Sequence, residues 1–173
     1  MAEPATPAGL PTPSGPAGPA TPAGAATPAG PATSDRRAAP LSRDEARDLL
    51  RVAHAAAQLA YSPYSGVRIG AALLAQGGEV FAGCNVENAS YGLSQCAERV
   101  ALAKAVSAGE RRFRAIAVAS SRPQPPLPCG ACRQVLREFA ADLFVVCQGA
   151  EGPPLEASLA ELLPLPFTGR DVV

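Results

Sequence analysis

The chain has 173 residues and carries 15 basic and 15 acidic side chains, so its formal net charge is zero. This length supports one domain with a sizeable core, and the charge balance gives no basic surface for DNA or RNA. No run of 18 apolar residues predicts a membrane span, and the N-terminus lacks the features of a secretory signal. We therefore expect a cytoplasmic protein whose ligand is small and neutral.

Residues 1–40 differ in composition from the rest, because they hold ten of the 19 prolines and repeat the motif TPAG at Thr6, Thr21 and Thr27. Collagen requires Gly at every third position, and half of those positions here are Thr. Large apolar residues are almost absent, so this segment cannot offset its ordering entropy by burial. We predict a disordered, polyproline-II-like tail over 1–40, with partner binding as the less favoured reading, and a folded domain over 41–173.

The folded part opens with a capping box of Ser42 and Glu45, which predicts a helix that starts at Ser42 and ends before Pro63. Its apolar residues form one stripe. His54, the single histidine of the chain, lies on another face of this helix. We expect it to be a solvated surface residue and not a metal ligand.

The segments VRIGAALLA (67–75) and EVFAGCNVE (79–87) flank Gln-Gly-Gly and predict a β-hairpin. Further along, the pattern predicts helices over 95–108, 130–141 and 157–163, and strands over 113–120 and 142–148. This order of elements indicates an α/β fold with a mixed β-sheet sandwiched by helices.

Three cysteines stand at the predicted starts of two helices: Cys96, and the C-x-x-C pair of Cys129 and Cys132. Exposed N–H groups and the helix dipole favour thiolates there, and two residues between cysteines let both bind one metal. Three sulfur ligands leave a fourth tetrahedral position open, which is typical of a catalytic zinc site. We predict one Zn²⁺ per chain.

The cysteines admit two other interpretations. The C-x-x-C pair alone could be a redox site, although no thioredoxin-like context surrounds it. A structural zinc module would need Cys84 or Cys147 as a fourth ligand, and both lie in apolar strands where a buried cysteine is the plainer interpretation. An odd number of cysteines without a signal peptide argues against a disulfide framework.

Glu98 lies two residues after Cys96, in the first turn of the predicted helix, where an acidic residue also suits the helix dipole. At this distance its carboxylate can reach a water activated by the metal, take its proton and return it to a leaving group. Three thiolates would leave zinc with a charge of about −1, so a positive group should offset them. Arg99 is the predicted group, and Arg133 and Gln134 are the alternatives.

Four segments, SPYSGVRIGAALL, GCNVENASYGLSQCAERVALAKAVSAG, PCGACRQVLREF and ELLPLPF, resemble the small, homotetrameric cytidine deaminases over nearly all of 41–173. The zinc-deaminase signature has a Cys or His ligand, a nearby Glu and a P-C-x-x-C motif. The resemblance implies zinc-dependent hydrolysis of cytidine and 2′-deoxycytidine to uridine and 2′-deoxyuridine with release of ammonia, a reaction of pyrimidine salvage. It also implies a homotetramer with shared active sites.

The resemblance assigns further roles. Asn85 and Glu87 match residues that bind the ribose 3′-hydroxyl, and Ala97 matches the residue whose backbone N–H meets the pyrimidine carbonyl. Ala89 and Tyr91 match residues that line a neighbouring subunit's site, and Phe167 matches an aromatic that covers the base across a subunit interface. These roles are expectations from the family, to be compared with the structure.

One position departs from the family pattern. Val67 stands where members usually carry a Phe that packs on the base, so stacking is lost there. A deaminase of another aminopyrimidine, such as a nucleoside antibiotic, a modified nucleoside or the free base, therefore stays open as an alternative. A polynucleotide deaminase is less favoured, because no basic channel with interleaved aromatics is evident.

Overall fold

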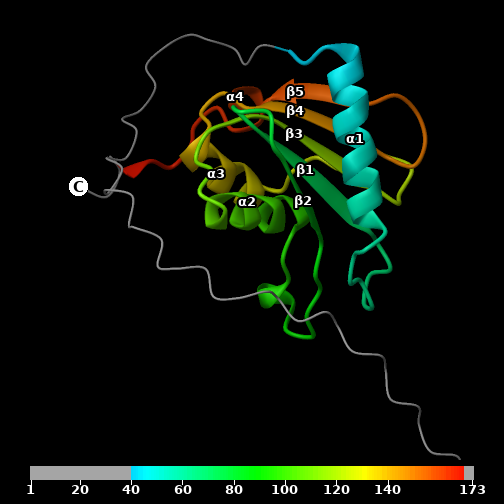
Figure 1. Cartoon of the computed structure of the whole chain (residues 1–173). Coiled ribbons are helices and arrows are strands. Elements are labelled where there is room, and N and C mark those ends of the chain that lie inside the picture. Colours follow the sequence, from blue (N-terminus) through cyan, green and yellow to red (C-terminus); the bar gives the residue numbers. More distant parts are fainter. Residues whose placement is uncertain (1–39, 170–173) are drawn as a thin grey trace, which may run out of the picture. The chain divides into compact units, whose positions relative to one another are not determined.

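The structure, a computed structural model, describes residues 40–169 (Figure 1). The tail predicted over residues 1–40 lies, except for Pro40, outside the described residues. Within the described part, none of the helices combines the length and the apolar character needed to cross a membrane.

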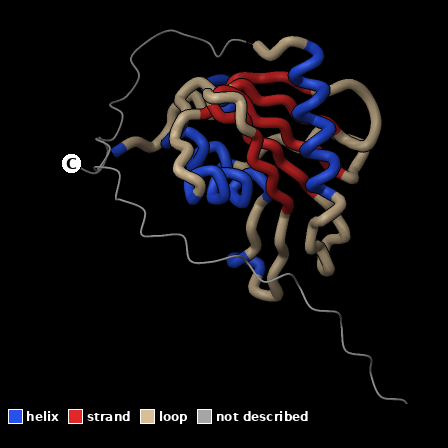
Figure 2. The backbone as a smooth tube through the Cα atoms, in the orientation of Figure 1, coloured by secondary structure: helices blue, strands red, loops and turns tan. Residues whose placement is uncertain are grey.

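Five strands form one mixed sheet in the order β2-β1-β3-β4-β5, which Figure 2 shows as adjacent strands. β1 pairs antiparallel with β2 and β3, β3 pairs parallel with β4, and β4 pairs antiparallel with β5. The elements are α1 (Arg43–Ala57), β1 (Ile69–Ala75), β2 (Val80–Cys84), the 3₁₀ turn η1 (Tyr91–Leu93), α2 (Ala97–Ser107), β3 (Phe113–Ser120), α3 (Gly130–Phe139), β4 (Phe144–Gln148), β5 (Leu155–Ser158) and α4 (Leu159–Leu162).

Helices cover both faces of the sheet, with α1 on one side and α2 and α3 on the other (Figure 1). Because side chains alternate along a strand, Leu73 and Ile116 pack toward α2 and α3, whereas Leu74 and Ala117 pack toward α1. The predicted mixed sheet sandwiched by helices is confirmed. The parallel β3–β4 pair is buried on both faces, as parallel strands require.

The helix that carries Cys96 and Glu98 lies unusually close to the sheet. A Cβ atom on Gly83 of β2 would lie 2.5 Å from the backbone nitrogen of Ala101 and 2.6 Å from the carbonyl oxygen of Ala97. Contacts this short are sterically forbidden, so a glycine is required at this position. The absence of a side chain lets α2 rest directly on β2, which fixes where its N-terminus lies.

Several boundaries differ from the predicted ones. α1 already ends at Ala57, and β5 was not predicted, because a four-residue edge strand with exposed Leu155 and Glu156 lacks an apolar alternation. β2 ends at Cys84, so the segment after it is not regular strand; Val86 keeps isolated bridges to Tyr61 and Gln95.

The expectation that His54 is a solvated surface residue was wrong. The ring is partly buried, and its Nε2 lies 3.1 Å from Oε1 of Gln148 at the end of β4. α1 packs across the sheet closely enough for this polar contact between residues far apart in sequence. His54 lies outside the sulfur cluster described below.

Candidate active site

The predicted metal ligands come together at the N-termini of two helices. Cys96 is the N-cap of α2, Cys129 is the N-cap of α3, and Cys132 lies in the first turn of α3. Their Sγ atoms all lie within 4.8 Å of one another, with 3.9 Å from Cys96 to Cys129 and 3.5 Å from Cys129 to Cys132. Both helix dipoles direct their positive ends at the three sulfur atoms, which favours thiolates.

The thiols influence one another's protonation. A hydrogen bond from Cys132, assisted by Cys129 and by the positive charge of Arg99, holds the pKa of the Cys96 thiol well below its usual range. The same hydrogen bond, together with burial, raises the pKa of Cys132. Thiolate sulfur is a soft donor that suits zinc.

Within residues 40–169, no His, Cys, Asp or Glu joins these three cysteines as a fourth ligand. Cys147 is buried in β4, where burial raises the pKa of its thiol to about 12, and Cys84 donates to the carbonyl of Leu59 at 3.5 Å. A four-ligand structural module therefore lacks its fourth ligand in the described residues. The open position is the arrangement of a catalytic zinc site.

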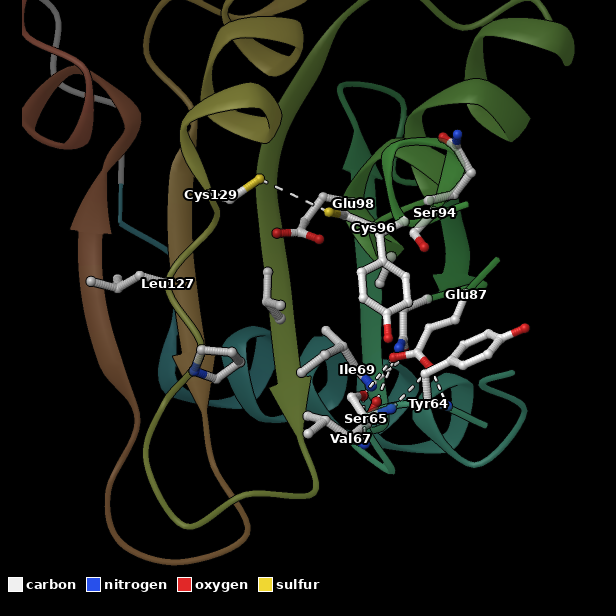
Figure 3. Close-up of a pocket in the computed structure, with 16 residues that line it drawn as sticks. Tyr64, Ser65, Val67, Ile69, Glu87, Ser94, Cys96, Glu98, Leu127 and Cys129 are labelled. Carbon is white, nitrogen blue, oxygen red and sulfur yellow. Dashed lines mark hydrogen bonds between the residues drawn. The ribbon is translucent and has the colours of Figure 1, made fainter. Parts of the chain in front are cut away.

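Glu98, the second residue of α2, is buried with 5 % of its surface exposed. Figure 3 shows its carboxylate next to the labelled cysteines, inside the cavity. Burial raises the pKa of this carboxyl, and the negative charge of Cys96 adds to the shift. A carboxyl with a raised pKa holds a proton more readily than an exposed carboxyl does, which suits a general acid–base group.

Cys96, Cys129 and Glu98 line a cavity of about 540 Å³, and Cys132 is buried next to them. Asn85 and Glu87 line it on the side away from the cysteines, where Figure 3 places Glu87 beside Ser65 and Tyr64. An apolar wall connects the two ends and consists of Val67, Ile69, Val118, Pro126 and Leu127. The cavity therefore has a reactive end, an apolar middle and a hydrogen-bonding end.

Asn85 and Glu87 also hold the loop between α1 and β1. Oδ1 of Asn85 accepts from the N–H of Ile69 at 2.7 Å, and its Nδ2 donates to the carbonyl of Val67 at 3.0 Å. Oε2 of Glu87 accepts from the N–H groups of Tyr64 and Ser65. The two side chains expected to bind the sugar are thus held in place by hydrogen bonds to backbone groups.

Arg99 lies where its charge can act on the metal ligands. It donates to the carbonyl of Ser94 at 2.8 Å, while its buried Nε has no hydrogen-bond partner. Its charge lowers the pKa of Cys96, as noted above. A buried guanidinium N–H beside a thiolate supports the predicted role of Arg99.

The alternatives to Arg99 have other partners. Arg133 donates to the carbonyls of Pro128 at 2.7 Å and Leu162 at 2.8 Å. Gln134 makes two hydrogen bonds to the backbone of Phe167, of 2.8 and 3.2 Å. Both residues tie α3 to its flanking segments and are less suited to offset the thiolate charge.

The remaining predicted residues divide into two groups. Ala97 lines the cavity, and Tyr91 lines its edge, where its ring meets that of Tyr64 with centroids 5.8 Å apart. Ala89 and Phe167 do not line the cavity of their own chain, and Phe167 is 60 % exposed. Asn85, Glu87, Tyr91 and Ala97 therefore line the same cavity as Cys96 and Cys129, whereas Ala89 and Phe167 lie outside it.

Sequence reasoning gave no role to Tyr64, Ser65, Pro126 or Leu127, which all line the cavity. The polar turn SPYS in the loop between α1 and β1 was a usable signal, because a hydroxyl in a turn often bonds to nearby backbone. Nothing in the loop before Cys129 distinguishes Leu127 from a solvated loop residue.

Residues 43–148 match the cytidine and deoxycytidylate deaminase zinc-binding region. Over 125 residues the chain is 49 % identical to a cytidine deaminase of Halalkalibacterium halodurans, covering 72 % of this chain and 95 % of that protein. It is 31 % identical over 109 residues to a blasticidin-S deaminase of Bacillus cereus, covering 58 % of this chain and 76 % of that protein.

Among solved structures, the chain resembles the cytidine deaminase of Burkholderia pseudomallei with a TM-score of 0.68 and 47 % identity, covering 73 % of this chain and all of that one. The cluster of three cysteines fits the zinc-binding region that the family model describes. The chain belongs to the cytidine and deoxycytidylate deaminase family.

Proposed function

We propose that this protein hydrolyses the exocyclic amine of cytidine and of 2′-deoxycytidine, giving uridine or 2′-deoxyuridine and ammonia. One observation carries the proposal: a single cavity is lined by Cys96, Cys129 and the buried carboxyl of Glu98, with Cys132 clustered beside them, and also by the amide of Asn85 and the carboxylate of Glu87. A nucleoside has the matching features, with a reactive C4 on the base and hydroxyls on the sugar.

The cysteines fit zinc by their chemistry, since three thiol sulfurs within 4.8 Å form a soft donor set. Cys96, Cys129 and Cys132 would hold the ion. Zinc bound there would supply Lewis acidity and lower the pKa of a water molecule.

Glu98 moves the protons of the reaction. Water adds to C4 of the base while an Oε atom of Glu98 takes a proton from that water and delivers it to N3. The same carboxylate then takes the proton of the new C4 hydroxyl and gives it to the amine, so that the C4–N bond breaks, the C4 carbonyl forms, and cytidine and water yield uridine and ammonia. Burial supports this role, because it raises the pKa of Glu98 and keeps bulk water from exchanging the proton.

Other residues orient the nucleoside. The N–H of Ala97 meets the pyrimidine carbonyl, and Asn85 and Glu87 receive the 3′-hydroxyl. The apolar wall holds the base between these polar groups. Because the described contacts do not require a 2′-hydroxyl, both sugars should serve.

The alternative substrate is another aminopyrimidine nucleoside. Val67 in the apolar wall is smaller than an aromatic residue, which leaves room for a larger base or substituent. Asn85 and Glu87 nevertheless favour a substrate that carries a sugar hydroxyl over the free base.

The chain would act in pyrimidine salvage in the cytoplasm. Its metal site needs three reduced thiols, and the cytoplasm keeps thiols reduced. All five cysteines are free in the structure. This supports the proposed location.

The assembly would be a homotetramer with shared sites. Phe167 is 60 % exposed and stays outside its own chain's cavity, as does Ala89, so both are available to a neighbour; Tyr91 lies at the rim. Further large apolar side chains are exposed: Leu59, Tyr61, Val86, Leu93 and Leu165. Exposed apolar surface of this extent favours contact with another chain.

Mixed oligomers test the shared site. Chains carrying Phe167→Ala should retain zinc but bind cytidine more weakly. When they are assembled with Glu98→Gln chains, some sites combine an intact Glu98 with a neighbour's intact Phe167, and the affinity of those sites should recover. An average of the two parents, or an active monomer in light scattering, would rule out sharing.

The function itself is tested by an ultraviolet assay of the purified protein with cytidine, 2′-deoxycytidine, cytosine and adenosine. We expect rapid conversion of both cytosine nucleosides, slow conversion of cytosine and none of adenosine. Failure to convert cytidine by zinc-replete protein would refute the proposal. A preference for a bulkier aminopyrimidine nucleoside would establish the alternative.

A further inference from the structure

The hydroxyl of Ser65 has two hydrogen bonds that fix its direction. Its Oγ accepts from the N–H of Val67 at 3.0 Å and donates to Oε1 of Glu87. A hydroxyl has one proton to donate. Since an ionised carboxylate can only accept, this proton is committed to Glu87.

Glu87 receives three hydrogen bonds from the same short loop. Oε1 accepts from the Ser65 hydroxyl, and Oε2 accepts from the N–H groups of Tyr64 at 2.9 Å and Ser65 at 3.2 Å. The Ser65 hydroxyl is the largest cause that lowers the pKa of Glu87, followed by the backbone of Tyr64. The carboxylate is therefore held ionised and in one orientation.

These hydrogen bonds leave part of the bonding capacity of Glu87 and Asn85 unused. A carboxylate offers about four acceptor positions, so three bonds from the loop leave about one on Glu87. Asn85 uses Oδ1 for Ile69 and one N–H of Nδ2 for Val67, which leaves the second N–H. Asn85 and Glu87 thus bring one remaining donor and one remaining acceptor to the same cavity, and a hydroxyl, which both donates and accepts, matches this pair.

We propose that Ser65 is a positioning residue that orients Glu87 to accept a hydrogen bond from a sugar hydroxyl, so that Ser65 sets the preference for hydroxylated nucleosides. The proposal rests on the nucleoside function given above. Ser65 itself has no free proton for the sugar, and it therefore acts through Glu87. Without its hydroxyl, Oε1 of Glu87 would lose its protein partner and rotate toward solvent.

The test compares Ser65→Ala with two controls. Ser65→Thr keeps the hydroxyl. Ser62→Ala makes the same change in the same loop, where Ser62 contacts Gly66 through its backbone carbonyl. Each protein is assayed with cytidine and with 2′,3′-dideoxycytidine, which lacks both hydroxyls of the sugar.

We expect Ser65→Ala to raise the KM for cytidine about tenfold, the scale of one charge-assisted hydrogen bond, with kcat changed less than about twofold. The KM for 2′,3′-dideoxycytidine should stay within about twofold, and Ser65→Thr should restore the KM for cytidine. Equal changes for both substrates, no change for either, or a matching effect of Ser62→Ala would overturn the proposal.

Product binding gives an independent readout. Calorimetry with uridine and 2′,3′-dideoxyuridine should show weaker binding of uridine alone in Ser65→Ala. This measurement needs no turnover, so it decides the role of Ser65 even if the proposed reaction fails in the ultraviolet assay. The positioning role would be refuted if Ser65→Ala bound uridine as tightly as the unmodified protein does and still preferred uridine to 2′,3′-dideoxyuridine.

Discussion

The two ends of the cavity are built in different ways. At the sulfur end, all three cysteines and Glu98 lie at the N-cap or in the first turn of α2 or α3. At the hydroxyl end, Asn85 and Glu87 follow β2 and bond to a loop some twenty positions earlier in the chain. The first end is held by helix geometry, and the second by contacts between separate segments.

This difference indicates a division of work. The sulfur end carries the metal and the proton transfer, so changes there should lower metal content or kcat. The hydroxyl end selects the ligand, so changes there should raise KM. The division fails if substitutions at the two ends produce the same kinetic change.

The largest effect is expected for Cys129→Ala, which removes a ligand from the sulfur end. Zinc should fall from one per chain to near zero, activity should disappear, and stability should decrease because metal binding contributes to folding. Metal analysis and thermal unfolding measure this.

Cys147→Ala and Cys84→Ala are the matched controls, since these residues lie outside the cluster. Both variants should keep one zinc per chain. Loss of zinc from Cys147→Ala would support a structural module and contradict the three-ligand site.

Glu98→Gln should have the next largest effect. The amide is nearly isosteric but cannot transfer the proton, so kcat should fall by at least about 10²-fold while zinc is retained. Glu138→Gln, an exposed acid on α3, is the control and should behave like the unmodified protein. Near-normal kcat in zinc-replete Glu98→Gln would exclude the proton-transfer role.

At the hydroxyl end, Asn85→Ala should raise the KM for cytidine. The fall in kcat/KM should correspond to about 1–3 kcal/mol, because a sugar hydroxyl is left without its hydrogen-bond partner. The loss on cytosine should be much smaller. The neighbouring control is Asn88→Ala. It removes a side chain whose Oδ1 accepts a hydrogen bond from the N–H of Ser90. If cytidine and cytosine lose equally, Asn85 only holds the loop.

The smallest effect should lie away from both ends. Hydrogen bonds from Arg114 and from Ser42 lower the pKa of Glu45 from 4.5 to about 2. A carboxyl whose pKa is lower in the folded state than in the unfolded state stabilises the fold at pH values above its unfolded pKa. This contribution is lost as the pH falls through the folded pKa.

Urea unfolding can detect this contribution. Glu45→Gln should lower stability at pH 7, and the difference from the unmodified protein should shrink as the pH falls from about 4.5 toward 2. Its kcat and KM at pH 7 should be unchanged. A pH-independent difference would show that the cap acts by packing and not by charge.

The two ends of the cavity also differ in how far the sequence predicts them. The capping box at Ser42 is a local signal, and so is the C-x-x-C spacing of Cys129 and Cys132; the start of α1 and the cysteine cluster were predicted from such patterns and agree with the structure. The roles of Ser65 and Tyr64 depend on β1 pairing with β2, which brings their loop to Glu87.

Other features depended on tertiary contacts in the same way. The bond of His54 to Gln148 follows from how α1 crosses β4, and the bonds of Gln134 to Phe167 follow from how the chain returns to α3 after α4. β5 forms because β4 offers an open edge, although its own sequence has a weak strand pattern. No local pattern reports such pairings.

The central claim is that one zinc ion, bound by three cysteines, makes this protein active as a cytidine deaminase. The most direct measurement adds zinc stepwise to metal-free protein and follows cytidine turnover and bound zinc in the same samples. We predict that turnover rises in proportion to bound zinc up to one per chain, and that Cys132→Ala neither retains the ion nor gains activity. Full turnover without zinc, or a zinc-saturated protein that leaves cytidine unchanged, would contradict the claim.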